Sequence, residues 1–177
     1  MSVNDAILAI LADESTHGRT MLQKKMYFLS VLANENFGFR PHFFGPYSSQ
    51  VSTSLSALGE ADFVKETRMG YGIPTNFGEM SRYDYDLSDS GKEVVGNRPE
   101  IKSRYSEYLD RINDSGVASD INTISIAAKV HFILSDQGEA TSSQITEQAE
   151  SLGWNVSGRD IRRVVQSLES LGLVTYE

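Results

Sequence analysis

Three arginines and a glutamine near the C-terminal end have the spacing of one helical face. Arg159, Arg162, Arg163 and Gln166 stand at i, i+3, i+4 and i+7, and we refer to them as the arginine face. The arginine fork can bond O6 and N7 of guanine together, so this face suits the major groove of DNA. The competing interpretation is a solvated surface on which arginines pair with nearby Asp160 or Glu169, because such faces are common on ordinary helices.

The overall charge restricts how the chain could bind nucleic acid. The 177 residues carry a net charge of −8, and each side of Asn97 holds 8 basic and 12 acidic residues. A typical nucleic-acid-binding protein has a basic excess, which releases counterions from the phosphates. DNA binding by this chain would therefore need a local cationic face. The acidity itself indicates either solubility or a saline cytoplasm.

The sequence lacks the residue patterns of several common catalytic and metal-binding sites. There is no cysteine, and the histidines (His17, His42 and His131) are not spaced as zinc ligands. No nucleophile elbow, Walker A loop or dinucleotide fingerprint is present. We therefore expect a non-enzymatic protein with no metal and no cofactor. No apolar run approaches a membrane span and no signal-like segment opens the chain, so we expect no membrane contact and a cytoplasmic location.

The first half has the pattern of three helices followed by two strands. Residues 3–13 predict a helix, and Thr20 and Gln23 have capping-box spacing for a second. Ser48 or Ser49 can cap a third helix, which stops at Gly59. The second helix is apolar on several sides, which predicts a central buried position with Lys24 and Lys25 at its exposed edge. Residues 37–46 predict an ordered extended loop. Residues 63–68 and 82–87 alternate as an antiparallel hairpin with a loop between them.

The second half repeats this plan after a linking helix. Ser119 can cap a helix through Leu134, and two capping boxes follow, at residues 141–144 and 157–160. Gly172 stops the last helix before a strand at 173–176. Residues 54–59 match 167–172 at an offset of 113, which suggests a weak internal repeat.

This order predicts a mainly α fold with a small β-hairpin, made of tandem winged helix-turn-helix units. The predicted parts are a winged-helix domain over 1–97, an amphipathic connecting helix over 98–116, and a second winged-helix-like domain over 117–177 with a truncated wing.

The stretch from Gly18 to Val64 resembles a known family. It contains the segments GRTMLQKKMY and FFGPYS, followed by a helix ending in LG. These segments resemble the YwgA-like uncharacterised proteins of bacteria and archaea, and more distantly Panacea-type antitoxin domains. The first resemblance implies a winged-helix-type fold without an established activity. The second implies toxin neutralisation by protein contact, although Phe43 stands near the position of that family's tryptophan.

The shared motif has two interpretations. Gly45 and Pro46 can form a rigid turn that simply locks the helix-turn-helix core. Alternatively, the motif forms a polar pocket, whose residues would be Arg19, Gln23, His42, Tyr47 and Ser48.

Two functional hypotheses follow. The first is a transcription-regulator-like protein that binds double-stranded DNA through the arginine face. The second is a protein-binding adaptor without DNA contact, either antitoxin-like or like the kleisin partners of chromosome-condensing complexes. The acidity of both halves and the uncharged third helix of the first unit favour the second hypothesis. A homodimer could also form, with the connecting helix or the final strand as its surface.

Overall fold

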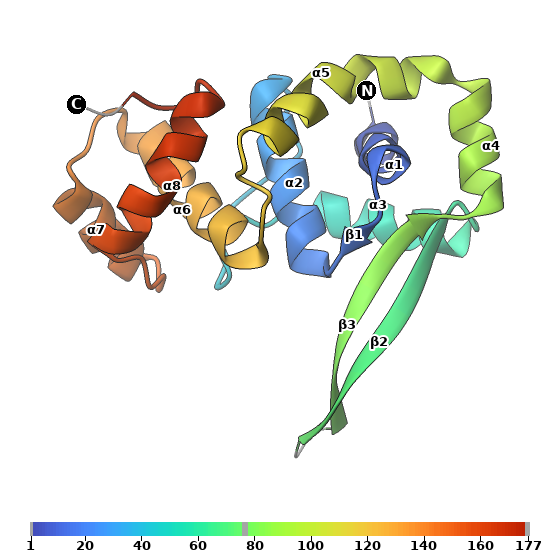
Figure 1. Cartoon of the computed structure of the whole chain (residues 1–177), viewed down its shortest axis with the longest axis horizontal. Helices are drawn as coiled ribbons and strands as arrows, with labels where there is room; N and C mark the ends of the chain where they lie inside the picture. The colour runs from blue at the N-terminus through green and yellow to red at the C-terminus, as the bar shows by residue number, and fades with distance from the viewer. Residues whose placement is uncertain (1, 76–77, 176–177) are drawn as a thin grey trace.

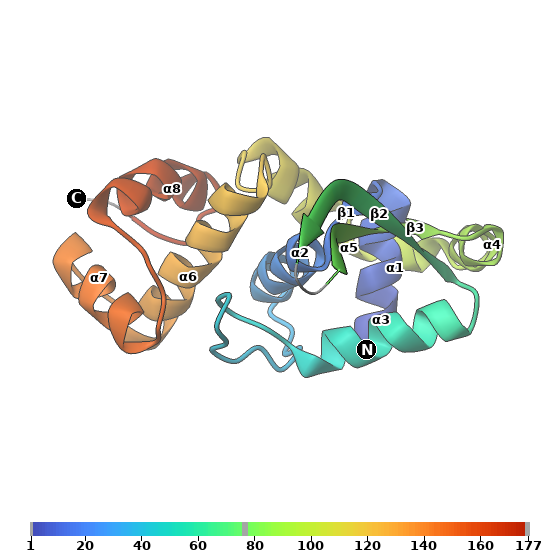
Figure 2. The same cartoon turned by 90° about the horizontal axis from the view of Figure 1, so that it is seen from below.

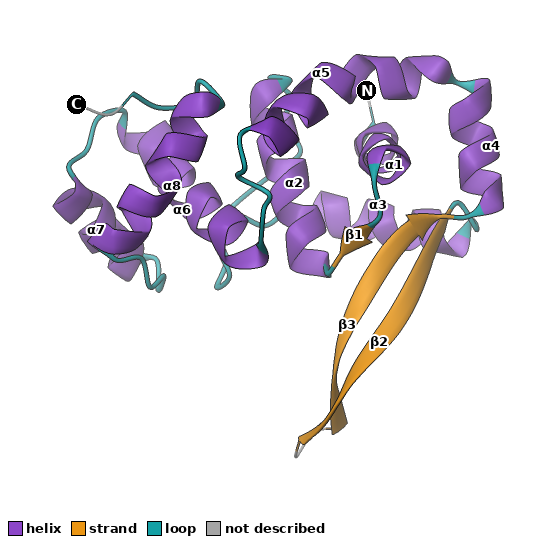
Figure 3. Cartoon of the chain, in the orientation of Figure 1, coloured by secondary structure: helices purple, strands orange, loops and turns teal. Residues whose placement is uncertain are grey.

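A computed structural model describes residues 2–75 and 78–175, and it is mainly helical with a small antiparallel sheet (Figure 3). This confirms the predicted mainly α class, with a three-stranded sheet in place of a two-stranded hairpin. The elements are α1 (Val3–Asp13), β1 (Thr16–His17), α2 (Arg19–Leu32), α3 (Ser49–Glu60), β2 (Val64–Thr75), β3 (Gly78–Leu87), α4 (Asp89–Asn97), α5 (Pro99–Asp114), α6 (Ile121–Gln137), α7 (Ser142–Ser151) and α8 (Gly158–Ser170). Figure 1 shows α6, α7 and α8 gathered at one end of the molecule and the sheet below the other.

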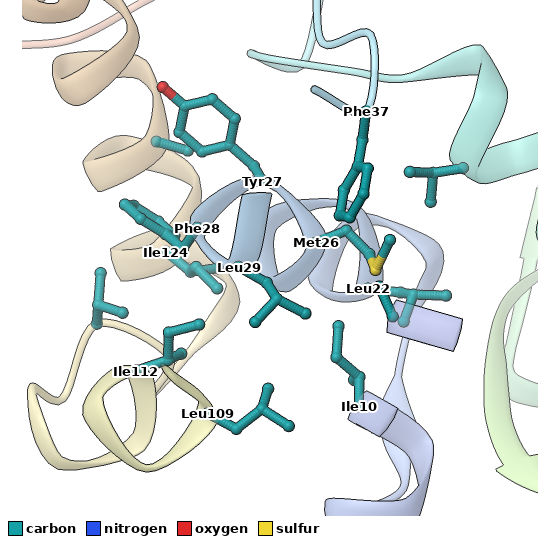
Figure 4. Close-up of a cluster of buried hydrophobic side chains, with 14 of the residues drawn as sticks. Ile10, Leu22, Met26, Tyr27, Phe28, Leu29, Phe37, Leu109, Ile112 and Ile124 are labelled. Carbon is teal, nitrogen blue, oxygen red and sulfur yellow. The ribbon is translucent and has the colours of Figure 1, made fainter. Parts of the chain in front are cut away.

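Helix α2 lies at the centre of the core, as its apolar composition predicts. Leu22, Met26, Phe28 and Leu29 are buried. Figure 4 shows them among side chains from other helices, which include Ile10, Leu109, Ile112 and Ile124. Because α2 contacts α1, α5 and α6, a single helix joins the two ends of the chain into one core.

The sheet has the order β1-β3-β2, and all of its pairs are antiparallel. Thr16 pairs with Tyr85, and Val64 pairs with Leu87. Most of the stretch predicted as a loop after residue 68 is strand, and the register shifts between Gly70 and Pro74. A bulge accommodates glycine and proline in an extended ribbon, so these residues did not end the strands. The ribbon of β2 and β3 projects away from the helices (Figure 1).

The start of α2 differs from its prediction in two ways. Gly18, at φ +99°, is the N-cap, and no side chain caps the helix, so the predicted Thr20–Gln23 capping box is wrong. The amide of Gln23 is used by Ser48 instead. Lys24 and Lys25 are also buried rather than exposed, because their ammonium groups find partners in Pro46 and Glu14.

Helices α3 and α8 end in the same way. The chain turns left-handed at Asp62 (φ +58°) and at Gly172 (φ +71°). The next amide bonds back to the helix in each case, over 2.9 Å from Phe63 to the Leu58 carbonyl and over 3.0 Å from Leu173 to the Leu168 carbonyl. Both ends are Schellman motifs. Gly59 lies inside α3, so the predicted stop there is wrong, and the equivalent ends are 110 residues apart rather than 113.

The C-terminal helices confirm both predicted capping boxes, at Thr141 and at Ser157. Helix α6 is capped by Asp120 rather than Ser119, and it continues to Gln137. The predicted strand over 173–176 is wrong for residues 173–175, which pair with none of the strands β1, β2 and β3 of the described sheet. Residue 176 lies outside the described part of the chain. No helix within 2–75 and 78–175 is long and apolar enough to cross a membrane.

Candidate functional site

All four residues of the arginine face are exposed on one side of α8. The opposite side of the helix buries Ile161, Val164 and Leu168 in the core. The capping box at Ser157 fixes where the helix begins, and the apolar stripe then fixes its rotation. The structure therefore brings the four predicted residues together on a solvent-facing surface.

One member of the arginine face is partly neutralised by its own helix. Arg163 Nη2 lies 3.6 Å from Oδ1 of Asp160. Hydrogen bonds from the Ser157 side chain and backbone lower the pKa of Asp160, and the charges of Arg163 and Arg159 lower it further. Within the described ranges, neither Arg159 nor Arg162 has a carboxylate within ion-pair distance. The competing interpretation, a face occupied by internal acids, thus holds for Arg163 alone.

The motif residues Gln23 and Ser48 are bonded to each other in the core. The Gln23 side chain donates to the Ser48 carbonyl and accepts from the Ser48 amide, over 3.0 Å each. The Ser48 hydroxyl donates to the Phe37 carbonyl and accepts from the Val51 amide, so it caps α3 from a fully buried position. These bonds support the interpretation that the motif holds the turn before α3 in place.

Arg19 is directed away from the other motif residues. Its Nε donates to the Tyr85 hydroxyl over 2.8 Å, its Nη2 lies 3.2 Å from Glu66, and its guanidinium covers the Tyr83 ring at 4.2 Å. The Tyr85 hydroxyl also donates to Glu66, and burial, reinforced by this carboxylate, raises the pKa of Tyr85. Arg19 therefore ties the start of α2 to the sheet, and it forms no hydrogen bond with the proposed polar pocket.

A buried lysine supports the turn from the other side. Lys24 is 2% exposed, and its Nζ donates to the Pro46 carbonyl over 2.6 Å. Burial, together with the nearby charge of Lys129, lowers its pKa to about 8. A Cβ added to Gly45 would come within 3.0 Å of Lys129 Cγ and 3.3 Å of Lys24 Nζ, and its φ is +98°. The backbone conformation thus favours glycine here, and a side chain would also have to displace the two lysines.

The loop between α2 and α3 carries two aromatic rings into solvent. Phe43 is 72% exposed and Phe44 is 63% exposed, and their ring centroids lie 5.0 Å apart in an edge-to-face arrangement. Figure 2 shows this loop reaching toward the end formed by α6, α7 and α8. The Trp154 indole donates there to the His42 carbonyl over 2.7 Å. His42 also stacks on Tyr47, with ring centroids 4.9 Å apart.

The other two histidines, His131 and His17, contact side chains of the protein itself. His131 is buried beside Tyr27, with 2.7 Å between its Nδ1 and the hydroxyl, and burial lowers its pKa to about 4. His17 lies 3.1 Å from Asp84, which also pairs with Arg82. Across the residues that the structure describes, no three or more His, Asp or Glu side chains gather as they would around a metal ion.

Comparison with known proteins adds no assignment: no family model matches this chain, and no curated protein matches it. The resemblance to the YwgA-like proteins consequently remains a prediction based on the GR-x-x-LQK and GPYS segments.

Proposed function

We propose that the protein is a non-enzymatic winged-helix regulator that binds double-stranded DNA through α8. The observation that carries this proposal is the exposed arginine face over a buried apolar stripe. In a helix-turn-helix, the second helix of the pair enters the major groove with one face outward. Helix α8 follows α7 after a short connection and has that exposure.

The order of elements supports the winged-helix part of the proposal. The first half runs α1-β1-α2-α3-β2-β3, with β1 paired to β3, and the ribbon of β2 and β3 is the candidate wing. The second unit would consist of α6, α7 and α8 without a wing. The boundaries at residues 97 and 116 remain part of the prediction.

The charge distribution supports α8 as the DNA-contacting surface. Over residues 117–177 the cations are Lys129, Arg159, Arg162 and Arg163, so three of the four lie on the arginine face. The remaining residues of 117–177 include one basic and eight acidic side chains, which would repel phosphate. Within this part of the chain α8 would therefore be the element that approaches DNA, and the affinity should fall steeply with salt.

The test is filter binding of a duplex of about 20 base pairs and mixed sequence, at about 50 mM salt. We expect Arg159→Ala/Arg162→Ala/Arg163→Ala to weaken binding by at least about 100-fold and to reduce the salt slope by about 3. The control is Lys65→Ala/Lys92→Ala/Lys102→Ala, which removes the same charge from exposed positions elsewhere. Absence of binding by the wild type, or equal losses in both variants, would reject the proposal.

A protein-binding adaptor without DNA contact is the second candidate. It is favoured by the outward side of α3, where Gln50, Thr53 and Ala57 are exposed and uncharged and the helix ends at an exposed carboxylate, Glu60. Without a cation, this helix cannot draw in phosphate, whereas it suits a protein surface. An adaptor of the antitoxin-like or kleisin-partner-like kind would retain its partner in the triple arginine variant.

A further inference from the structure

The loop tip at Phe43 and Phe44 is unusual because it is both apolar and exposed. These two side chains are the most exposed large apolar groups among the residues with described side chains. Their rings contact each other and not the core. Contiguous apolar groups held in solvent commonly mark a binding surface, because a lone folded chain gains nothing from exposing them.

The tip is also held rigidly. Arg40 and Tyr47 close the loop through two backbone hydrogen bonds of 3.0 and 2.9 Å, and the Gly45 amide bonds to the His42 carbonyl. Lys24 on α2 anchors the Pro46 carbonyl, and Trp154, in the segment between α7 and α8, anchors the His42 carbonyl. A rigid aromatic anchor loses little conformational entropy on binding, which is typical of interface hot spots.

The surroundings of the tip are cationic in an acidic protein. The 24 residues between Glu35 and Glu60 include no carboxylate, and Arg40 is exposed among them. Lys129 packs against Gly45 from α6, close to Lys24; burial lowers the pKa of Lys129, and the charge of Asp160 partly offsets this. A partner that reaches the tip therefore meets positive charge next to apolar surface.

We propose that this tip is a docking site for an acidic segment of a partner protein that also carries a large apolar side chain. Phe43 and Phe44 are the apolar anchors. Arg40 and Lys129 receive the carboxylates. The proposal goes beyond DNA binding by α8, because none of these residues lies on α8, and it gives an adaptor role a defined contact surface.

The experiment uses a displayed library of random peptides of about 12 residues. Peptides that bind the wild type are selected first, and those that also bind Phe43→Ser/Phe44→Ser are then removed. We expect peptides that combine Asp or Glu with Leu or an aromatic residue. Their affinity should fall at least about tenfold in the double serine variant. The matched control is Met69→Ser/Ile121→Ser, which removes two other exposed apolar side chains and should leave the affinity unchanged.

If the double serine variant is destabilised, two charge-reversal variants test the proposal independently. Arg40→Glu should weaken the same peptides several-fold, whereas Arg68→Glu on β2, also exposed, should not. The proposal is overturned if no peptide is enriched, if the enriched peptides lack carboxylates, or if Arg40→Glu leaves their affinity unchanged.

Two other occupants of the tip would be revealed by the serine variant. Loss of duplex DNA binding in this variant would assign the tip to a nucleic-acid surface, and loss of self-association would assign it to a second copy of the chain. Either result would also overturn the proposal.

Discussion

Helices α3 and α8 follow the same construction and present opposite surfaces. Each begins at a serine cap, buries an apolar stripe and ends in a left-handed turn. Outward, α3 exposes no cation and a single carboxylate, Glu60, at its end, whereas α8 exposes three arginines. Caps and buried stripes determine where each helix lies, and they leave its outward positions free to differ. Function in this molecule must therefore be sought in those outward positions and in the loop before α3.

The two helices also differ in how they are held. The cap of α3 is fully buried and is bonded to α2 and to Phe37, whereas the cap of α8 is exposed and bonded only within its own first turn. We conclude that α3 depends on distant residues and α8 on adjacent ones. Substitutions at the caps and ends of the two helices should therefore differ in cost, and Gln23 should be the most sensitive position.

Gln23→Ala should destabilise the protein by about 4 kcal/mol, because it leaves the buried amide and carbonyl of Ser48 without partners. Gln166→Ala on the exposed side of α8 should change the free energy of unfolding by less than about 0.5 kcal/mol. Urea unfolding followed by circular dichroism measures both. Equal losses would remove the contrast between the two helices.

Acid should destabilise the protein through His131, because protonation places a charge in the buried contact between α6 and α2. The folded pKa, about 4, lies below the ordinary value of 6.5, so the unfolded chain binds the proton first as the pH falls. The contribution to stability is complete above about pH 6.5 and is lost progressively toward about pH 4, by about 3 kcal/mol. His131→Gln should flatten this part of the pH profile of unfolding. An unchanged slope between these pH values would contradict the assignment.

The two serine caps provide a matched pair. Ser48→Ala should cost about 2 kcal/mol, because its hydroxyl both caps α3 and donates to a buried carbonyl. Ser157→Ala should cost about 1 kcal/mol, the ordinary value for an exposed cap. Amide hydrogen exchange should show faster opening at the start of α3 in the first variant, and at the start of α8 in the second. A larger loss from Ser157→Ala would reverse our conclusion about which helix depends on distant contacts.

The smallest effects are expected at the left-handed ends. Gly172→Ala should cost about 1 kcal/mol, because alanine is strained at φ +71°. Asp62→Gly should stay within about 0.5 kcal/mol of the wild type, since relief of strain offsets the added freedom of the unfolded chain. Thermal unfolding of both variants checks this order. If Asp62→Gly were the more damaging change, its side chain would have a role that the backbone does not explain.

Local patterns in the sequence predicted the local features of the fold. The capping boxes at Thr141 and Ser157, the buried α2 and the ordered loop over 37–46 all depend on residues close together in the chain. The exposure of the arginine face also followed from helical spacing alone. These features could be predicted because 3.6-residue periodicity and capping act within a few residues.

The predictions for the start of α2 were wrong because side chains there bond far along the sequence. Gln23 has the spacing of a capping box, yet its partner is Ser48, 25 residues away. Lys24 resembles an exposed lysine, and only the Pro46 carbonyl explains its burial. The contact of Trp154 with His42 spans 112 residues, and no local pattern signals it. The composition of the aromatic loop could have drawn attention to Phe43 and Phe44, because two adjacent phenylalanines beside a proline turn need not be buried.

Trp154 has a practical consequence of its own. It is the single tryptophan of the chain, it is 2% exposed, and its indole N–H is engaged by the His42 carbonyl. Its fluorescence therefore reports on the contact between the loop and the C-terminal helices without any added label. Separation of these parts would expose the ring to water and shift its emission to longer wavelength, so an emission shift that precedes the loss of the helical circular dichroism signal reports opening at this contact before the whole chain unfolds.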